Sequence, residues 1–397
     1  MVKKGRSEFV NKIYLLIMLP LFYQTHLKSQ LNLAEYILLK ILIIMLQSIK
    51  KVRLEALATA LPIPIIFASR RKKIQRFLSS PSLTIAKIWL PIVTTWLDTY
   101  FFSGEIVYVV IDRTNWARVN LLMISVVWDK RAFPVYFALL PKLGSSNLDE
   151  QKAALSKSLP ILTNYKVCVL GDREFCSVKL ASWLREQGVY FCLRLKKNEF
   201  IEVRNEIWSE LNNLGLSPGV SFFLPGVKVT KHKGSSGFNV AGKWQRKLLG
   251  VAPKEGWFIL TNMASLELAI TAYKKRFDIE EMFRDFKKGG YNLEDTSVAG
   301  ERLIGLILLI SIAYTAATIQ GQQIKRKGIQ KYIGRVKEYG RSERRHSSFY
   351  IGLYGQAWVN FMEPCMKLVT ELIKLNRNKQ KYYQQGMRAM KLILAAS

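Results

Sequence analysis

The chain of 397 residues has few of the side chains that most often bind zinc or act as nucleophiles. It holds three histidines and four cysteines, and the histidines are far apart in the sequence. No Cys-x-x-Cys pair occurs, so neither a zinc site nor histidine-based catalysis is expected. Most of the cysteines lie in or beside apolar segments, which indicates buried free thiols in a reducing cytoplasm.

Acidic residues are also scarce, because 29 aspartates and glutamates face 60 lysines and arginines, for a net charge of +31. The excess is concentrated at the two ends. Residues 1–80 hold 14 basic against 3 acidic residues, and residues 321–397 hold 16 against 4. This charge predicts a polyanionic partner, with nucleic acid ahead of membrane lipid.

Long uninterrupted hydrophobic runs are few. Ile13–Tyr23 follows a basic start, as in a signal peptide, but Pro20 interrupts it and no small-residue cleavage site follows. Leu303–Ile319 has 17 residues without a charge, which is the short limit of the roughly 17–25 residues that span a bilayer. A buried helix of a large core fits this segment as well, and we expect no stable membrane association.

Residues 1–80 are predicted to form a helical, basic N-terminal segment that binds DNA. Apolar residues recur at three- and four-residue spacing from Leu31 to Ile49. After the turn Pro62–Pro64, a second helix is expected to start on a Ser69 cap. This arrangement loosely resembles a helix-turn-helix, and a helical bundle with a basic face is the alternative. The predicted DNA-contacting residues of this helix are Arg70, Arg71, Lys72, Lys73 and Arg76.

Residues 81–196 change to an alternating α/β pattern, in the order β-β-β-α-β-α-β. This order is typical of the ribonuclease H-like fold, a mixed sheet with helices on both faces. Three antiparallel strands continue there into two parallel ones. The expected strands are Glu105–Ile111, Val119–Trp128, Phe133–Leu140, Val167–Leu170 and Val189–Leu195.

The rest of the chain is predicted to hold three further parts. Residues 197–265 form a β-rich insertion, and residues 266–320 form the second part of the catalytic core. That second part begins with one helix over 266–288 and ends with a buried helix. Residues 321–397 form a basic, mostly helical C-terminal region, with Gly352 and Gly355 in a loop.

Three acidic residues are candidates for catalysis. Asp112 follows a fully apolar strand, Asp172 follows a second one, and Glu280 lies on an amphipathic helix. An aspartate after a strand can simply form a turn, and Asp172 can cap the next helix. However, an unpaired carboxylate is costly to bury beside apolar residues, and a bound cation would compensate for that cost. The nearest competitors rank lower because they do not end a central strand; these are Asp98, Asp129 and Glu174.

The helix that carries Glu280 also carries a stripe of polar residues. With 100° per residue, Tyr273, Arg276, Glu280 and Lys287 fall within about 60° of one another. A purely solvated helix can show the same spacing. Three converging carboxylates would hold two divalent cations, Mg²⁺ or Mn²⁺, which is a common device for cutting and joining phosphodiesters.

The spacing Tyr273-x2-Arg276-x3-Glu280-x6-Lys287 matches the Y-R-E-K signature of the insertion sequence four family of DDE transposases. The segments around Asp112 and Asp172 also resemble the two aspartate blocks of that family, so that the resemblance spans about 105–290. It implies catalysis by the three acids and phosphate contacts by Tyr273, Arg276 and Lys287. It further implies an aromatic residue that receives a flipped base in the insertion. Trp244 and Trp257 are the candidates, and both can equally be core residues.

The resemblance predicts a transposase that binds the terminal inverted repeats of its own element, excises it and inserts it into target DNA. It would act as a homodimer on double-stranded DNA, in the cytoplasm and associated with the nucleoid. A hydrolytic nuclease on the same fold is the first alternative. An inactive DNA-binding remnant and a membrane protein with basic loops are the others.

Overall fold

The computed structural model describes residues 19–204, 206–230, 235–246, 255–335, 339, 346–375 and 377–395. Contacts divide the chain into two compact units. One comprises Val93–Phe283, and the other combines the residues up to Ile92 with those from Arg284 onward. The candidate catalytic acids all belong to the first of these units.

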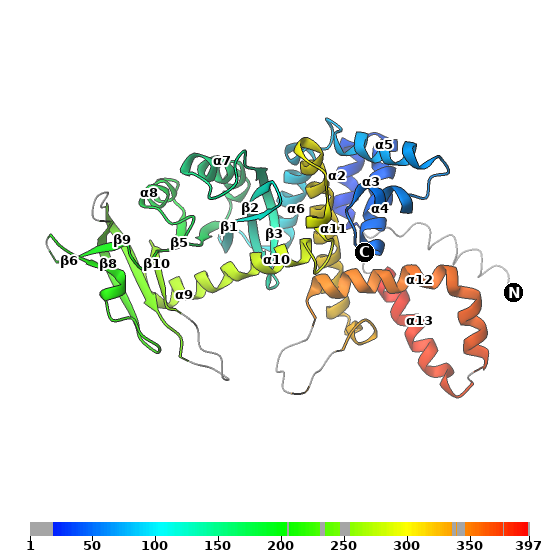
Figure 1. Ribbon diagram of the computed structural model, residues 1–397. Coiled ribbons are helices and arrows are strands. Elements are labelled where there is room, and N and C mark those ends of the chain that lie inside the picture. The colour runs from blue at the N-terminus through cyan, green and yellow to red at the C-terminus, as the bar shows by residue number, and fades with distance from the viewer. Residues whose placement is uncertain are drawn as a thin grey trace. The chain divides into compact units, whose positions relative to one another are not determined.

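The first unit is built on a large mixed sheet, most of whose strands are labelled in Figure 1. β2 pairs antiparallel with both β1 and β3, whereas β4 is parallel to β1 and to β5. The five strands therefore lie in the order β3-β2-β1-β4-β5, which is the ribonuclease H-like arrangement predicted from the sequence. Their bounds are β1 Ile106–Trp116, β2 Val119–Trp128, β3 Arg131–Leu139, β4 Lys166–Gly171 and β5 Tyr190–Arg194.

Short loops explain the antiparallel half of this sheet. Trp116 pairs directly with Val119, so that β1 extends further than the sequence predicted. Between β2 and β3, Asp129 and Lys130 have φ values of 52° and 57°. Two consecutive residues with positive φ form a tight hairpin turn whose twist matches that of the strands.

The β-rich insertion continues the same sheet beyond β5. Within the described residues, β10 pairs with β5 and the order runs on as β10-β9-β8-β6-β7. β9 ends at Lys243, so that Trp244 lies just beyond it. The bounds are β6 Phe200–Arg204, β7 Ile207–Glu210, β8 Ser221–Val229, β9 Ser235–Lys243 and β10 Trp257–Thr261.

Helices cover this sheet from both sides, with α7 and α8 on one side and α9 on the other (Figure 1). A capping box of Asn147 and Glu150 starts α7 where the sequence predicted a helix. The single helix predicted over 266–288 is wrong, because a 3₁₀ turn at Lys275–Phe277 separates α9 from α10. The bounds are α6 Leu90–Tyr100, α7 Leu148–Ser158, α8 Val178–Glu186, α9 Leu266–Lys274 and α10 Asp278–Phe286.

The second unit is helical within its described residues. α5 begins at Phe67 with no side-chain cap, so the predicted Ser69 cap is wrong. Ile65, Ile66 and Phe67 are exposed before the basic turn of this helix. The bounds of its α-helices are α2 Leu21–Gln30, α3 Leu33–Ile49, α4 Leu54–Ala60, α5 Phe67–Leu78, α11 Gly300–Arg326, α12 Ser348–Leu375 and α13 Gln380–Leu394. Short turns of 3₁₀ or π-helix in this unit lie at Ile85–Trp89, Leu293–Asp295, Gln330–Tyr332 and Arg377–Lys379, and those of the first unit lie at Leu159–Leu162 and Leu211–Asn213.

Helix α11 is the central element of the second unit. It is long and apolar enough to cross a membrane, but its most apolar 18-residue stretch is 94% buried inside the chain. One of its polar side chains also bonds within the unit, because Thr315 accepts a hydrogen bond of 2.8 Å from the Tyr23 hydroxyl. The burial agrees with the prediction of a buried helix over 301–320.

Helix α12 contains the two glycines that the sequence placed in a loop, and that prediction is wrong. Gly352 lies where α12 crosses α11, and a Cβ there would be 1.8 Å from the Ala317 carbonyl oxygen. Gly321 on α11 makes the reciprocal approach, 1.8 Å from the Ser348 carbonyl oxygen. The glycines are therefore helical residues that allow two backbones to touch, which a pattern of local turn signals cannot distinguish from a loop.

Candidate active site

The two candidate aspartates lie at the end of the pairing between β1 and β4. β1 and β4 are parallel neighbours, and Ile111 lies opposite Gly171 at the end of their pairing. Asp172 directly follows β4, whereas Asp112 lies within β1 and pairs with Met123, so the prediction that Asp112 follows the strand is wrong. Because β1 and β4 run parallel and in this register, both aspartates come directly after the last paired residues and lie side by side.

Position 171 has no room for a side chain larger than that of glycine. A Cβ there would lie 2.8 Å from Cβ of Phe175 and 3.0 Å from a methyl carbon of Leu193. The chain then turns sharply, and a carboxylate oxygen of Asp172 accepts a hydrogen bond of 2.8 Å from the amide of Glu174. This turn fixes the direction in which Asp172 leaves the strand.

An ion pair joins the two aspartate segments. The guanidinium of Arg113 donates to both carboxylate oxygens of Glu174, at 2.9 Å each from Nε and Nη2. Glu174 also accepts bonds of 2.9 and 3.0 Å from the amide and hydroxyl of Ser146. Glu174 is therefore fully engaged, which agrees with its low rank as a catalytic acid. The sequence did not predict this bridge, because only the parallel register brings residue 113 beside residue 174.

The third acid is linked to the first through Arg276. Nη1 of Arg276 lies 3.5 Å from a carboxylate oxygen of Asp112, and Nη2 forms an ion pair with Glu280. The Arg276 side chain is only 7% exposed, whereas that of Glu280 is 53% exposed. The 3₁₀ turn thus places a buried guanidinium between a buried and an accessible carboxylate.

Asp112 has an unusual protonation equilibrium. Burial raises its pKa to about 7, and the charges of Asp172 and Glu280 add to this effect. The amide of Arg113 and the charge of Arg276 oppose the shift without cancelling it. The charges of both other acids therefore act on Asp112, and the nearby guanidinium of Arg276 only partly offsets the effect of burial on its pKa.

The donor set at this edge fits divalent cations, because carboxylate oxygens are the ligands preferred by Mg²⁺ and Mn²⁺. Within the described part of the chain, no three His, Cys, Asp or Glu side chains are close enough to hold a metal ion. Arg276 supplies the positive charge between Asp112 and Glu280 instead. Cation binding by Asp112, Asp172 and Glu280 stays a prediction, and a cation there would replace the charge of Arg276.

Tyr273 lies in the wall of the same site. It is fully buried, and its hydroxyl has no hydrogen-bond partner among the described residues. Burial raises its pKa to about 12, although the charges of Arg276 and Arg194 act in the other direction. A buried donor without a partner is costly. The contact of Tyr273 with a phosphate stays a prediction, because the hydroxyl is buried in the free protein.

The two candidate tryptophans differ in their surroundings. The ring of Trp257 packs edge-on against Tyr273, with ring centres 5.2 Å apart, and it also contacts Phe277. The backbone of Trp244 exchanges hydrogen bonds with Gly219 and Val220 just beyond β9. Trp257 therefore stabilises the wall that holds Tyr273. The role of either residue in stacking on a flipped base stays a prediction.

Lys287 belongs to the other compact unit. It follows the end of α10, and its ammonium lies 2.7 Å from a carboxylate oxygen of Glu294. Its predicted contact with a phosphate is not tested by this arrangement.

The basic side chains of helix α5 fall into two groups, those with a partner inside the unit and those exposed to solvent. Arg71 pairs with Glu55 at 3.1 Å, and Arg70 donates to the carbonyl oxygen of Leu61 at 3.4 Å. Both side chains therefore brace α5 against the preceding helix and turn, and their predicted role in DNA contact stays open. The other three are exposed; they are Lys72, Lys73 and Arg76.

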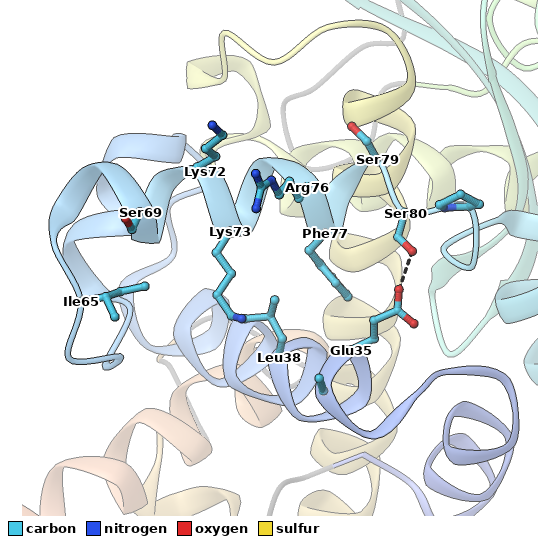
Figure 2. Close-up of a pocket in the computed structure, with 12 residues that line it drawn as sticks. Glu35, Leu38, Ile65, Ser69, Lys72, Lys73, Arg76, Phe77, Ser79 and Ser80 are labelled. Atoms are coloured by element: carbon cyan, nitrogen blue, oxygen red, sulfur yellow. Dashed lines mark hydrogen bonds between the residues drawn. The ribbon is translucent and has the colours of Figure 1, made fainter.

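These three exposed cations border a cavity of about 560 Å³ in the second unit. Figure 2 shows them on α5, with the hydrogen bond of 2.5 Å between Ser80 and Glu35 at one side of the cavity. The lining therefore combines an excess of positive charge with one oriented carboxylate. This composition agrees with a surface that contacts a polyanion.

Comparison with known proteins identifies the family. The family model described as the transposase DDE domain matches residues 108–316, which is more than half of the chain. The protein therefore belongs to the family of transposases with a DDE domain. The match includes Asp112, Asp172 and Glu280. It does not distinguish the insertion sequence four family from other DDE families.

A solved structure is also similar, the cryo-EM structure of a piggyBac transposase synaptic complex with hairpin DNA. The two chains share 12% identity, with a TM-score of 0.40. The similarity covers 76% of this chain and 61% of the other, so this chain spans less than two thirds of that protein. No curated protein matches the sequence.

The raised pKa of Asp112 has a consequence for stability. Because the folded pKa of about 7 exceeds the ordinary value of 3.8, the contribution of this group to stability falls as pH rises through that range. Asparagine carries no charge, so Asp112→Asn removes the cost of burying an ionised carboxylate at this position. The variant should therefore be more stable than the wild type by about 2–4 kcal/mol at pH 8, with no difference near pH 4.

Urea unfolding at several pH values in the presence of EDTA measures this difference. Asp129→Asn, on the β2–β3 turn, serves as the control. A variant Asp112→Asn that is as stable as or less stable than the wild type at pH 8 would show that Asp112 is ionised and compensated in the free protein.

Proposed function

We propose that the protein is a transposase that excises its own element and inserts it into new DNA. The observation that carries this proposal is the cluster of Asp112, Asp172, Arg276 and Glu280, within the part of the chain that matches the DDE domain. The cluster combines acids of one polar edge with a buried guanidinium. That is the composition needed to handle a phosphodiester and its charge.

The three acids would hold divalent cations, Mg²⁺ or Mn²⁺, which when bound activate the attacking hydroxyl and stabilise the leaving oxygen. Arg276 would then exchange Glu280 for a phosphate of the cut strand, since a guanidinium pairs with either group. The buried hydroxyl of Tyr273 would donate to the same phosphate after Arg276 changes partner. The Arg113–Glu174 bridge keeps Asp112 and Asp172 at a constant separation while the other groups change partners.

We assign recognition of the element ends to the N-terminal helices. The exposed cations of α5 would contact backbone phosphates, and contacts of α4 and α5 with bases would supply sequence choice. We further propose that two copies act together on DNA and that the protein is cytoplasmic, at the nucleoid.

The exposed cations of α5 give a prediction about binding. Changing Lys72, Lys73 and Arg76 together to alanine should weaken binding to an element-end duplex and lower its salt slope by roughly three, because about 0.9 counterions are released per phosphate contact. Gel shifts over a range of salt concentrations measure both effects. The matched control changes Lys379, Lys381 and Arg388 in the C-terminal region. If the control loses more affinity for element ends, recognition lies in that region instead.

A cleavage and joining assay tests the function itself. Purified protein with Mg²⁺ should nick a duplex at the element end and then join that end to a target plasmid. Cutting without joining would favour a hydrolytic nuclease. Specific binding with neither activity would favour an inactive DNA-binding remnant.

A further inference from the structure

Two further arginines lie at the catalytic edge, and both are paired with one carboxylate. Arg173 directly follows Asp172, and Arg194 ends β5, the strand beside β4. The Nη2 atoms of both arginines contact the same oxygen of Glu255, and that of Arg194 lies at 2.8 Å. Glu255 therefore holds together two cations, one from the loop after β4 and one from the end of β5.

This cluster is close to the groups already described. The charge of Arg194 acts on Tyr273, so the two side chains share one environment. Glu255 itself lies two residues before Trp257, whose ring packs against Tyr273. The pair of arginines is thus continuous with the wall of the candidate active site.

The three partners differ in how firmly they are held. The side chain of Arg194 is only 15% exposed, and it also contacts the carbonyl oxygen of Gly256 at 3.4 Å. The side chains of Arg173 and Glu255 are 41% and 47% exposed. Ion pairs between such exposed groups contribute little to stability, so the carboxylate can leave at small cost while Arg194 stays in place.

We propose that Arg173 and Arg194 form a binding site for a backbone phosphate of the DNA, and that Glu255 occupies this site in the free protein. A guanidinium recognises a carboxylate and a phosphate with the same donors. Glu255 thus masks two cations beside the acids until DNA displaces it, which lowers the affinity of the free site for arbitrary DNA. This inference rests on the proposed function, because it takes DNA as the ligand of this edge.

Binding of a random 30-base-pair duplex, measured by fluorescence anisotropy in EDTA between 50 and 300 mM NaCl, tests the proposal. Glu255→Gln should bind about 3- to 10-fold more tightly than the wild type at low salt, with a salt slope steeper by about one. The matched control is Glu202→Gln, which removes the same charge from an ion pair with Lys228 elsewhere in the insertion. An equal gain in both variants would reveal a general effect of charge and overturn the proposal.

A double-mutant cycle separates masking from proximity. If Glu255 competes with the phosphate, Arg194→Ala should cost more affinity in the Glu255→Gln background than in the wild type, because only in that background does Arg194 bind the phosphate without competition. Equal costs in both backgrounds would overturn the proposal. Arg173→Ala, at a more exposed position, repeats the cycle if Arg194→Ala does not fold.

The outcome is independent of catalysis, since no cation is present. If the wild type cleaves and joins DNA but the double-mutant cycle is additive, the masking by Glu255 is refuted and the transposase function is not. If the cycle is non-additive but the protein binds the duplex without ever cleaving DNA, the transposase function is refuted and the phosphate site is supported.

Discussion

Replacing Glu280 by glutamine is expected to lower the rate of Mg²⁺-dependent cleavage at the element end by about 10³-fold or more. The change keeps the size of the side chain and removes the charge that would hold a cation. Losing one such ligand costs several kcal/mol of transition-state stabilisation, and each 1.4 kcal/mol is a factor of ten in rate. A time course of nicking on a labelled duplex measures the effect.

The neighbouring residue on the same helix offers a matched control. Glu281 lies 3.2 Å from Arg131 and serves a different contact. Glu281→Gln should retain most of the activity, and both variants should bind end DNA nearly as well as the wild type. Asp112→Asn and Asp172→Asn should behave like Glu280→Gln. Near wild-type cleavage by Glu280→Gln would exclude it as a catalytic acid.

Replacing Gly321 or Gly352 by alanine should destabilise the helical unit by about 3 kcal/mol or more. At either position the new Cβ would lie 1.8 Å from a carbonyl oxygen of the facing helix. A backbone atom cannot turn aside as a side chain does, so α11 and α12 would have to separate and lose packing along the crossing. Thermal unfolding of each variant measures the loss.

Gly386 provides the opposite case in α13. A Cβ there would meet no atom within 4 Å. Since glycine is a poor helix former, Gly386→Ala should stabilise the protein by roughly 0.5–1 kcal/mol.

If Gly352→Ala unfolded at the temperature of the wild type, the close approach of α11 and α12 would not exist in solution.

Local patterns in the sequence predicted the central part of the fold. The apolar runs before Asp112 and Asp172 identified two buried strands, and their short and long connections predicted which neighbours are antiparallel and which are parallel. The same runs located both aspartates at the end of the β1–β4 pairing. Such features depend on residues close together in the chain, and the sequence contains them directly.

Where the prediction failed, a distant contact decided the outcome. The regular helix assumed from Tyr273 to Lys287 contains a 3₁₀ turn, which carries Arg276 to Asp112. Gly352 is helical and packs against α11, and no residue near it in the sequence indicates this contact.

The sequence by itself determined the charge of the protein, its mixed sheet, and the three acids at the place where catalysis is proposed. Only the tertiary structure decided which ion pairs form at and around these acids: the Arg113–Glu174 bridge, the position of Arg276 between two carboxylates, and the pairing of Arg173 and Arg194 with Glu255. The physical reason is that the pKa and the ion pairs of a buried group depend on whichever charges the fold brings within a few ångströms, whatever their separation along the chain.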